Sequence, residues 1–273
     1  MRRGAFLGLC ASALGLAGCQ VIEPVWQTFT SETGKANDMF LKPFRSTTFM
    51  SWNIRAGRGL DGVRDIARAA AVIKDADADF VALQEVDRGT RRANGVDQLA
   101  ALAEATGLVP SWGKALDHDG GEYGVALLSR VAPQRVRLVP LPRLGKETER
   151  RVLLVADFPE LRIGVTHLSL DEAERLAAVR EIRAYIDSER PFFLAGDWND
   201  VPAGATVRAL RGPFAVLSGF APTFPANGPA RCLDYIAVSR RHRARFETVT
   251  HEVLDEAVAS DHRPIVVGCK LKM

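Results

Sequence analysis

The sequence alternates short apolar runs with longer amphipathic stretches from about residue 47 to its end. The apolar runs, which predict strands, occupy 47–54, 80–86, 123–129, 135–139, 152–158, 161–167, 192–195, 233–238, 245–249 and 265–269. The amphipathic stretches, which predict helices, occupy 63–76, 96–105 and 171–188. Between 123 and 167 turn signals but no helix separate the runs, which predicts antiparallel neighbours. This order predicts an α/β fold, a four-layer α/β/β/α sandwich of two packed mixed sheets with outer helices.

The first 19 residues have a different pattern. Two arginines follow Met1, an apolar stretch runs over 5–16, and Leu16-Ala17-Gly18 precedes Cys19. The apolar stretch is too short to span a bilayer, and small residues close it, as in a cleaved leader. The last four residues resemble the lipobox of bacterial lipoproteins. This resemblance implies that residues 1–18 are a signal peptide, that Cys19 carries a lipid, and that Gln20 directs sorting to the outer membrane of the cell envelope.

Residues 19–45 lack any sustained period and are expected to be a lipid-anchored tether, followed by one domain over 46–273. Arg2 and Arg3 would leave with the leader, which lowers the formal net charge from +3 to +1. A strong nucleic-acid binder more often has a pronounced basic excess, since phosphate neutralisation dominates that affinity. Nucleic acid is therefore a possible partner but not the favoured one, and we expect a monomer.

Two of the four cysteines remain free for chemistry in the mature protein, because Cys10 leaves with the leader and Cys19 is lipidated. Cys232 begins an apolar strand, whereas Cys269 ends one. If both strands start at the same edge, these residues lie too far apart for a disulfide. We therefore expect two buried free thiols.

Polar side chains interrupt the apolar runs at their ends. If the strands alternate in direction, these positions converge on one edge of the sandwich. Each alone has an ordinary explanation, because polar residues at strand ends are common. Their order and chemistry together predict a functional site. These residues are Asn53, Glu85, His167, Asp197, Asn199, Asp234, Asp261 and His262.

The segments that carry these residues resemble a known family. WNI, LQEV, THLS, GDWND, LDYI and SDHRP occur in that order between residues 47 and 269. They resemble the endonuclease/exonuclease/phosphatase superfamily over nearly the whole domain. This resemblance implies a four-layer α/β sandwich and Mg²⁺-dependent cleavage of a phosphoester bond, with Mn²⁺ as the alternative cation.

The chemistry of such a cleavage needs a metal to neutralise charge, a base for water, and donors around the phosphate oxygens. Asn53, Glu85 and Asp261 offer the oxygen ligands that a hard cation prefers, and the resemblance implies the same set. Asp197 is expected to activate the attacking water. Asn199 is expected to hold a phosphate oxygen or to position Asp197.

Asp234 and His262 are expected to form a pair. A carboxylate that accepts from an imidazole fixes the tautomer and favours the charged ring, which can donate to phosphate. The resemblance implies the same Asp–His dyad. His167 would be a second donor to the phosphate or to its leaving oxygen.

Arg55 and Tyr123 are the expected substrate-binding residues. Arg55 occupies a position at which the deoxyribonucleases have an arginine that touches phosphate. The Tyr123 hydroxyl would replace a contact that relatives make with an asparagine where this chain has Val125. The other histidines match no motif and are expected to be surface or structural residues: His118, His242 and His251.

The predicted substrate is a phosphodiester of the envelope, such as a phospholipid headgroup or a small phosphodiester. The chain has no obvious aromatic hairpin for membrane insertion, so a periplasmic or surface endonuclease or exonuclease is the alternative, and a phosphomonoesterase stays open. A run of arginines would bind an anionic ligand or simply form a solvated face. It comprises Arg240, Arg241, Arg243 and Arg245.

A hypothesis of another class is a non-catalytic lipoprotein that binds a phosphate ligand. Such a protein would have lost residues of the metal set or of the dyad. All of them are present in this chain.

Overall fold

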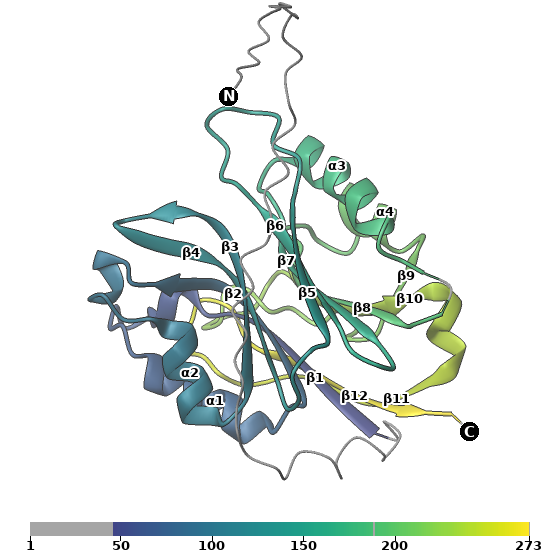
Figure 1. Ribbon diagram of the computed structural model, residues 1–273, viewed down its shortest axis with the longest axis horizontal. Coiled ribbons are helices and arrows are strands. Elements are labelled where there is room, and N and C mark those ends of the chain that lie inside the picture. Colours follow the sequence, from purple (N-terminus) through teal and green to yellow (C-terminus); the bar gives the residue numbers. More distant parts are fainter. Residues whose placement is uncertain (1–45, 188, 273) are drawn as a thin grey trace, which may run out of the picture. The chain divides into compact units, whose positions relative to one another are not determined.

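Two six-stranded mixed sheets form the centre of the computed structural model, which describes residues 46–187 and 189–272 (Figure 1). All of these residues fall in one compact unit, Pro43–Met273. The predicted signal peptide and tether, Cys19 included, lie outside the described residues and stay predictions. Within the described part of the chain, no helix is long and apolar enough to cross a membrane.

The first sheet has the order β11-β12-β1-β2-β4-β3. Its strands are β1 Ser46–Asn53, β2 Phe80–Arg88, β3 Val109–His118, β4 Gly121–Ser129, β11 Phe246–Val253 and β12 Ile265–Leu271. The second sheet has the order β5-β6-β7-β8-β10-β9. Its strands are β5 Arg135–Pro140, β6 Val152–Asp157, β7 Arg162–His167, β8 Phe192–Asp197, β9 Phe214–Val216 and β10 Asp234–Ser239.

Helices cover the outer face of each sheet. The helices α1 Ile66–Ala76 and α2 Gln98–Thr106 pack on the first sheet, and α3 Glu172–Arg183 and α4 Ala205–Leu210 pack on the second. A third apolar cluster fills the space between the sheets, where the rings of Phe49 and Phe193 stack at 4.3 Å. Each sheet therefore buries both of its faces, and the predicted four-layer sandwich is confirmed.

Among the described strands and α-helices, three have no counterpart in the sequence prediction: β3, α4 and β9. β3 contains Pro110 and Gly113, which are poor strand residues, but it lies at the edge of its sheet, where a missing N–H is tolerated. The predicted antiparallel neighbours at 123–167 are only partly right. β5, β6 and β7 pair in that way, whereas β4 pairs with β2 and β3 in the other sheet.

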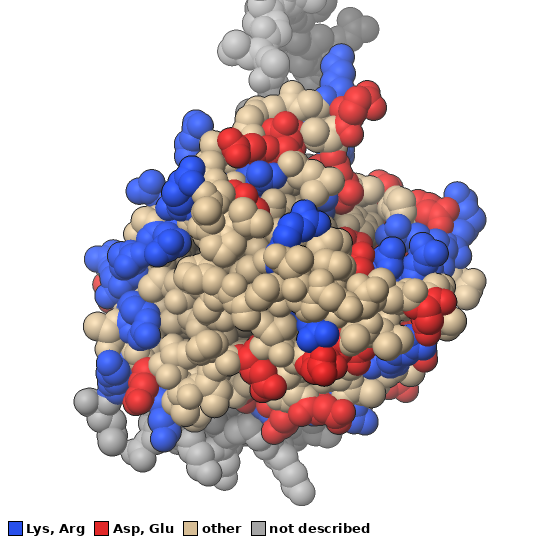
Figure 2. All heavy atoms as spheres, turned by 180° about the vertical axis from the view of Figure 1, so that it is seen from behind, with Lys and Arg blue, Asp and Glu red and all other residues tan. Residues whose placement is uncertain are grey.

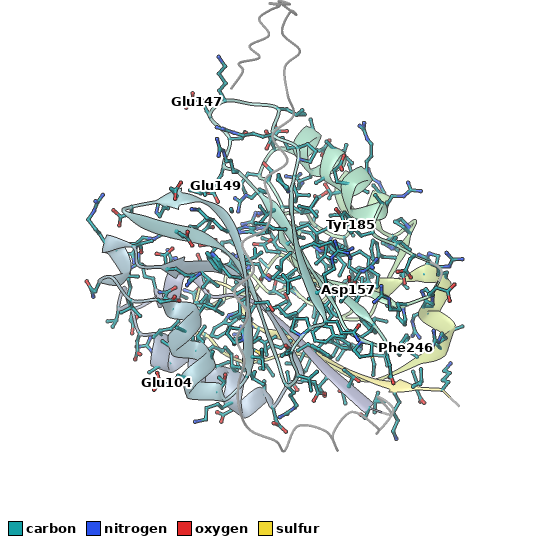
Figure 3. All side chains as sticks on the ribbon, viewed as in Figure 1. Glu104, Glu147, Glu149, Asp157, Tyr185 and Phe246 are labelled. Carbon is teal, nitrogen blue, oxygen red and sulfur yellow. The ribbon has the colours of Figure 1, made fainter. Side chains whose placement is uncertain are left out.

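Helix α3 ends at Arg183, earlier than the predicted position 188, and Arg162 bonds the segment that follows it. Its Nη1 donates to the Tyr185 carbonyl oxygen at 2.6 Å, while its Nε donates to Asp157 Oδ1 at 2.5 Å. Asp157 and Tyr185 are labelled in Figure 3. Arg162 therefore satisfies a carbonyl just beyond the helix end, where the N–H groups of residues 184–186 bond three residues back.

Strand direction brings the predicted site residues to one edge. β1 runs parallel to β2, and β7 runs parallel to β8, whereas β12 and β10 run antiparallel to their neighbours β1 and β8. The ends of the four parallel strands therefore meet the starts of β10 and β12. In this register His167, Asp197 and Asp234 lie side by side on adjacent strands. The predicted convergence on one edge is confirmed for these three positions.

Helix α3 also anchors the loop that precedes β6. The buried Glu174 accepts from the backbone N–H groups of Leu144 and Gly145 and from the hydroxyls of Thr148 and Ser169. Burial alone would raise the pKa of this carboxyl. The four hydrogen bonds outweigh burial and lower the pKa to about 2. One ionised side chain thus joins the loop at 141–151 to the segment after β7.

We expect Glu174→Gln to lower the free energy of unfolding at pH 7 by about 2–4 kcal/mol, because an ionised acceptor of several hydrogen bonds is lost. The folded pKa lies below the ordinary value of 4.5, so this stabilisation is fully present above about pH 4.5 and is lost as the pH falls towards 2. Urea titrations between pH 2 and 7 measure both effects. Glu172→Gln, an exposed neighbour on α3, is the control. Equal stabilities of the two variants at pH 7 would contradict this role.

Candidate functional site

Asn53, at the end of β1, lies between the two sheets and contacts both halves of the site. Its Nδ2 donates to Glu85 Oε1 at 2.9 Å and to Asp197 Oδ2 at 3.3 Å. Its Oδ1 accepts from the backbone N–H of Arg55, and its carbonyl oxygen accepts from the Ser260 hydroxyl. In this arrangement Asn53 acts as a donor that joins two carboxylates. Its predicted role as a metal ligand stays a prediction.

Glu85 lies at a bulge inside β2 rather than at the strand end that the sequence predicted. The pairing of β2 with β4 shifts register between Leu83 and Val86, and Glu85 has a φ of 57°. A bulge re-aims a side chain, and here it turns the carboxylate of Glu85 towards Asn53. Burial raises the pKa of Glu85, and the nearby charge of Asp261 adds to that rise.

Asp261 lies next to Arg55, whose Nε is 3.2 Å from Asp261 Oδ2. Arg55 therefore contacts a predicted metal ligand. It does not line the pocket described below. Its predicted contact with substrate phosphate stays a prediction.

Asp197, at the end of β8, is surrounded by polar groups of the site. Its Oδ2 lies 3.5 Å from His167 Nε2 and 3.7 Å from His262 Nε2, and its Oδ1 accepts from the backbone N–H of Asn199. Burial, with the charge of Asp234 nearby, raises the pKa of Asp197 to about 7. Asp197 is thus poised to gain or lose a proton near neutral pH.

The turn GDWND positions Asp197 through backbone constraints. Gly196 has a φ of 152°, and a Cβ there would overlap the carbonyl oxygen of Thr166 on the adjacent strand, so glycine is required. Trp198 is fully buried and stacks on Tyr235. Asn199 has a φ of 50°, and its Nδ2 donates to the Leu168 carbonyl oxygen at 2.8 Å. Asn199 therefore holds the turn beside Asp197, and its predicted role, to hold a phosphate oxygen or to position Asp197, stays a prediction.

Asp234 and His262 form the expected pair, which joins the two sheets. His262 Nδ1 lies 2.9 Å from Asp234 Oδ2, and that oxygen also accepts from the Thr223 hydroxyl at 2.5 Å. Burial alone would lower the pKa of His262. The charge and hydrogen bond of Asp234, with smaller contributions from the charges of Asp197 and Asp261, outweigh burial and raise the pKa of His262 to about 10. The His262 ring is therefore charged at neutral pH.

His167, by contrast with His262, is neutral at neutral pH. It is buried at the end of β7, and desolvation together with the charge of Arg151 holds its pKa well below the ordinary value. Its Nδ1 is buried without a hydrogen-bond partner among the described residues. A neutral and a charged imidazole thus flank the Asp197 carboxylate.

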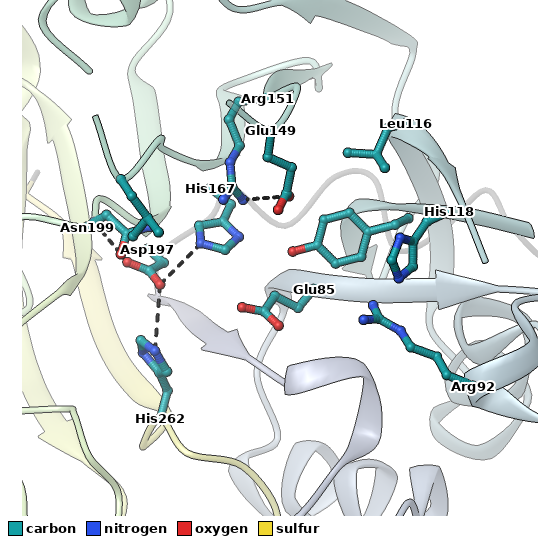
Figure 4. A pocket seen from close by; sticks show the side chains of 12 residues that line it. Glu85, Arg92, Leu116, His118, Glu149, Arg151, His167, Asp197, Asn199 and His262 are labelled. Carbon is teal, nitrogen blue, oxygen red and sulfur yellow. Dashed lines mark hydrogen bonds and ion pairs between the residues drawn. The ribbon is translucent and has the colours of Figure 1, made fainter. Parts of the chain in front are cut away.

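These side chains open into a pocket of about 360 Å³ (Figure 4). The predicted residues Glu85, Tyr123, His167, Asp197, Asn199 and His262 line it. Five further residues that were not predicted from the sequence also line it: Arg92, Leu116, Glu149, Arg151 and Leu170. His118 is a further lining residue, so its interpretation as a surface or structural residue was incomplete. His242, by contrast, is buried and contacts the Ser239 hydroxyl, and His251 is exposed.

Among the lining residues that were not predicted, Arg151 has the clearest chemistry in the structure. Its side chain is 9% exposed, and Nε is buried without a hydrogen-bond partner among the described residues. Nη1 lies 3.2 Å from Glu149 Oε1, an ion pair that lacks hydrogen-bond geometry. Figure 4 shows the Arg151 head group beside the His167 ring. A buried cation with unused donors is suited to an anionic ligand in the pocket.

Two groups of side chains are candidates for a divalent cation. Asp197, Asp234 and His262 offer ligand atoms within 4.8 Å of one another. That group fits a metal poorly, because a charged His262 ring has no free lone pair and Asp234 Oδ2 already accepts two hydrogen bonds, which leaves only Asp234 Oδ1 of that carboxylate without a partner among the described residues. Glu85 and Asp261 fit better, because two neighbouring carboxylates, one with a raised pKa, provide the hard oxygen donors that Mg²⁺ prefers.

The arginine run 240–245 forms the short helix η4 (Arg240–Arg245) at the opposite edge. It follows the end of β10, whereas Asp234 stands at its start. Figure 2 shows the molecule from behind, with Lys and Arg side chains gathered along the left margin, which is the right-hand side of Figure 1. None of these four arginines lines the pocket. Cys232 and Cys269 are buried and free, as predicted.

A family model described as the endonuclease/exonuclease/phosphatase family matches residues 50–262. No curated protein matches the chain. Among solved structures, an endonuclease/exonuclease/phosphatase from Beutenbergia cavernae is similar, with a TM-score of 0.68 and 27% identity over 83% of this chain and 72% of that chain.

Two further structures share the fold at lower identity. A mannosyl-6-phosphatase from Bacteroides thetaiotaomicron has a TM-score of 0.67 and 18% identity over 82% of this chain and 99% of that chain. The 2',3'-cyclic phosphatase ANGEL2 has a TM-score of 0.65 and 14% identity over 84% of this chain and 96% of that chain.

We expect Asp234→Asn to lower the pKa of His262 from about 10 to near or below neutrality, because the charge that outweighs burial is removed. In the wild type, a raised folded pKa means that the stabilisation from the charged ring is fully present below about pH 6.5 and is lost as the pH rises through 10. Histidine ring NMR of the EDTA-treated protein measures the titration. Asp117→Asn, at an exposed position, is the control. A His262 titration that stays at the wild-type pH in Asp234→Asn would show that another group sets its charge.

Proposed function

The chain belongs to the endonuclease/exonuclease/phosphatase family, whose members hydrolyse phosphoester bonds, and on that premise we propose that it is a divalent-metal-dependent phosphodiesterase. One observation carries the proposal. Asp197, a buried carboxylate with a pKa of about 7, lies between a neutral and a charged imidazole at the wall of an open pocket. Such a trio combines a base for water with two donors for phosphate oxygens.

In the proposed mechanism Asp197 accepts a proton from the attacking water. A base acts best when its pKa lies near the working pH, and the value for Asp197 meets that condition. Asn199 and Asn53 hold the Asp197 carboxylate through its two oxygens. Their hydrogen bonds fix its direction before substrate enters.

His262 and Arg151 supply positive charge for the phosphate. His262 carries its proton because Asp234 holds Nδ1, so Nε2 is left as a donor that faces the site. Arg151 adds a buried guanidinium with unused N–H groups. His167, which is neutral, donates a hydrogen bond to the phosphate or to the leaving oxygen. Charged and neutral donors together compensate the negative charge that grows in the transition state.

Glu85 and Asp261 would hold a divalent cation, Mg²⁺ or Mn²⁺, with water completing its coordination. When bound, the cation neutralises charge on the phosphate. Asn53 keeps Glu85 in place through its amide. The neighbouring carboxylates are the feature of this chain that supports the requirement for a cation.

We propose a small phosphodiester or a phospholipid headgroup as substrate, with endonuclease or exonuclease activity as the alternative. The pocket of about 360 Å³ suits a small group. The arginines of η4 lie at the opposite edge and do not extend the pocket into a basic track for nucleic acid. A lipid on Cys19 would place the enzyme in the bacterial envelope, at the outer membrane, as a monomer.

Hydrolysis of bis(p-nitrophenyl) phosphate by the full chain tests the activity. With Mg²⁺ or Mn²⁺ we expect turnover that EDTA abolishes and that Asp197→Asn and His262→Ala lower by about 10³-fold, as for loss of a general base or of a charged donor. Asp75→Asn, exposed on α1, is the control for folding.

A panel of phospholipids, DNA and RNA is assayed alongside that substrate. Absence of turnover on every member of the panel, with either cation, would leave the non-catalytic binding lipoprotein as the better explanation. Turnover confined to DNA or RNA would replace the envelope substrate with the nuclease alternative.

Metabolic labelling with a palmitate analogue tests the lipid anchor. When the full chain is expressed in a bacterium, we expect label on the wild type and none on Cys19→Ser, because the thiol carries the lipid. Cys10→Ser, in the predicted leader, is the matched control and is expected to keep its label. Equal labelling of wild type and Cys19→Ser would refute the anchor and leave the catalytic proposal untouched.

A further inference from the structure

The pocket is larger than a single phosphate group needs. Its volume of about 360 Å³ corresponds to roughly a dozen water molecules at about 30 Å³ each. Asp197, Asn199 and His262 lie at one end of it, and Arg92 and His118 lie at the other (Figure 4). The catalytic groups therefore occupy only part of the cavity, and the remaining part faces a second set of polar side chains.

Arg92 is held rigidly in that second set. Its Nε and Nη2 donate to the two oxygens of Asp87 at 2.6 and 2.7 Å, and Asp87 is fully buried behind it. The guanidinium lies 5.5 Å from the centre of the Tyr123 ring. A bidentate carboxylate and an aromatic face fix the plane of the group. Its remaining nitrogen, Nη1, takes part in none of the hydrogen bonds or ion pairs found within residues 46–187 and 189–272.

His118 is brought beside Arg92 by the turn between β3 and β4. Asp119 Oδ2 accepts from the backbone N–H of Arg92 at 2.6 Å, and the Asp119 carbonyl oxygen accepts from the N–H of Arg91. The His118 ring contacts the Tyr123 ring at 5.9 Å between centroids. Two donors from separate elements, η3 (Arg91–Ala93) and β3, thus face the same part of the cavity.

The carboxylates that face the pocket are already engaged elsewhere. Glu85 accepts from Asn53, and Glu149 pairs with Arg151. Asp87 approaches Arg92 from the buried side and leaves the opposite edge of the guanidinium open to the cavity. An anionic group at that edge meets Nη1 of a guanidinium whose other two nitrogens are held by Asp87.

We propose that Arg92 and His118 form a second anion-recognition subsite, which binds a negatively charged group of the substrate at the end away from the scissile bond. This proposal rests on the proposed function, because it assigns the substrate a phosphodiester at Asp197 and a further phosphate or carboxylate at Arg92. The preferred substrates are then phosphodiesters that carry a second negative charge.

Matched aryl phosphodiesters test the subsite. The probes are p-nitrophenyl phenyl phosphate and its 3-carboxyphenyl and 4-carboxyphenyl counterparts, which differ only in the added carboxylate. We expect the wild-type full chain to show kcat/KM about tenfold higher for at least one carboxylated probe, as for one charge-assisted hydrogen bond. Arg92→Lys and His118→Ala are expected to lower that ratio towards one. Lysine keeps a charge for the buried Asp87, so the variant avoids an unpaired carboxylate.

Arg91→Gln is the control, because Arg91 is the adjacent arginine and its side chain is 79% exposed. We expect it to keep the wild-type ratio. Equal kcat/KM for all three probes in the wild type, or a ratio unaffected by Arg92→Lys and His118→Ala, would overturn the subsite while leaving the phosphodiesterase intact.

Calorimetry separates failure of the subsite from failure of the proposed function. Phenyl phosphate and the two carboxyphenyl phosphates are titrated into the full chain and the same variants. If no diester is cleaved, the proposed function fails, and the subsite is then judged by binding alone. Tighter binding of a carboxylated ligand that Arg92→Lys weakens supports the subsite, and equal binding of all three ligands refutes it.

Discussion

The hydrogen bond between Asp234 and His262 is the interaction on which the site depends, because it joins the two sheets and sets the charge of the centre. Asp234 starts β10 of one sheet, and His262 precedes β12 of the other. The pair is buried, so its charges are weakly screened. Asp234 keeps His262 protonated, and the same negative charge helps to raise the pKa of Asp197. Asp234 thus helps to set the protonation of both the donor His262 and the base Asp197 at neutral pH.

Strand direction converts distant sequence positions into neighbours, which explains why much of the site could be predicted. Asn53, Asp197 and His262 terminate or precede apolar runs, and such runs predict strands well. Once the strands are placed, the register leaves few positions for these side chains. Strand direction also predicts that Cys232 and Cys269 stay free, since they lie near opposite ends of their strands.

Other features carried no such signal. β3 begins at Val109-Pro110 and is stabilised as an edge strand by pairing with β4, which a local pattern does not encode. The bulge at Glu85 is also a product of that tertiary pairing, so its place inside the strand could not be read from alternation. Arg92 and Arg151 lie in charged segments that are typical of solvated loops. Only the folded packing reveals that one is fixed by Asp87 and the other is buried.

The cluster around Glu174 has a consequence for affinity. The loop at 141–151 carries Glu149 and Arg151, and an untied loop of this kind would lose conformational freedom each time a ligand was bound. Glu174 fixes the loop through Leu144, Gly145 and Thr148, and fixes the segment after β7 through Ser169. The loss of entropy therefore occurs once, when the chain folds. Arg151 is preorganised for its ligand by a carboxylate that does not itself line the pocket.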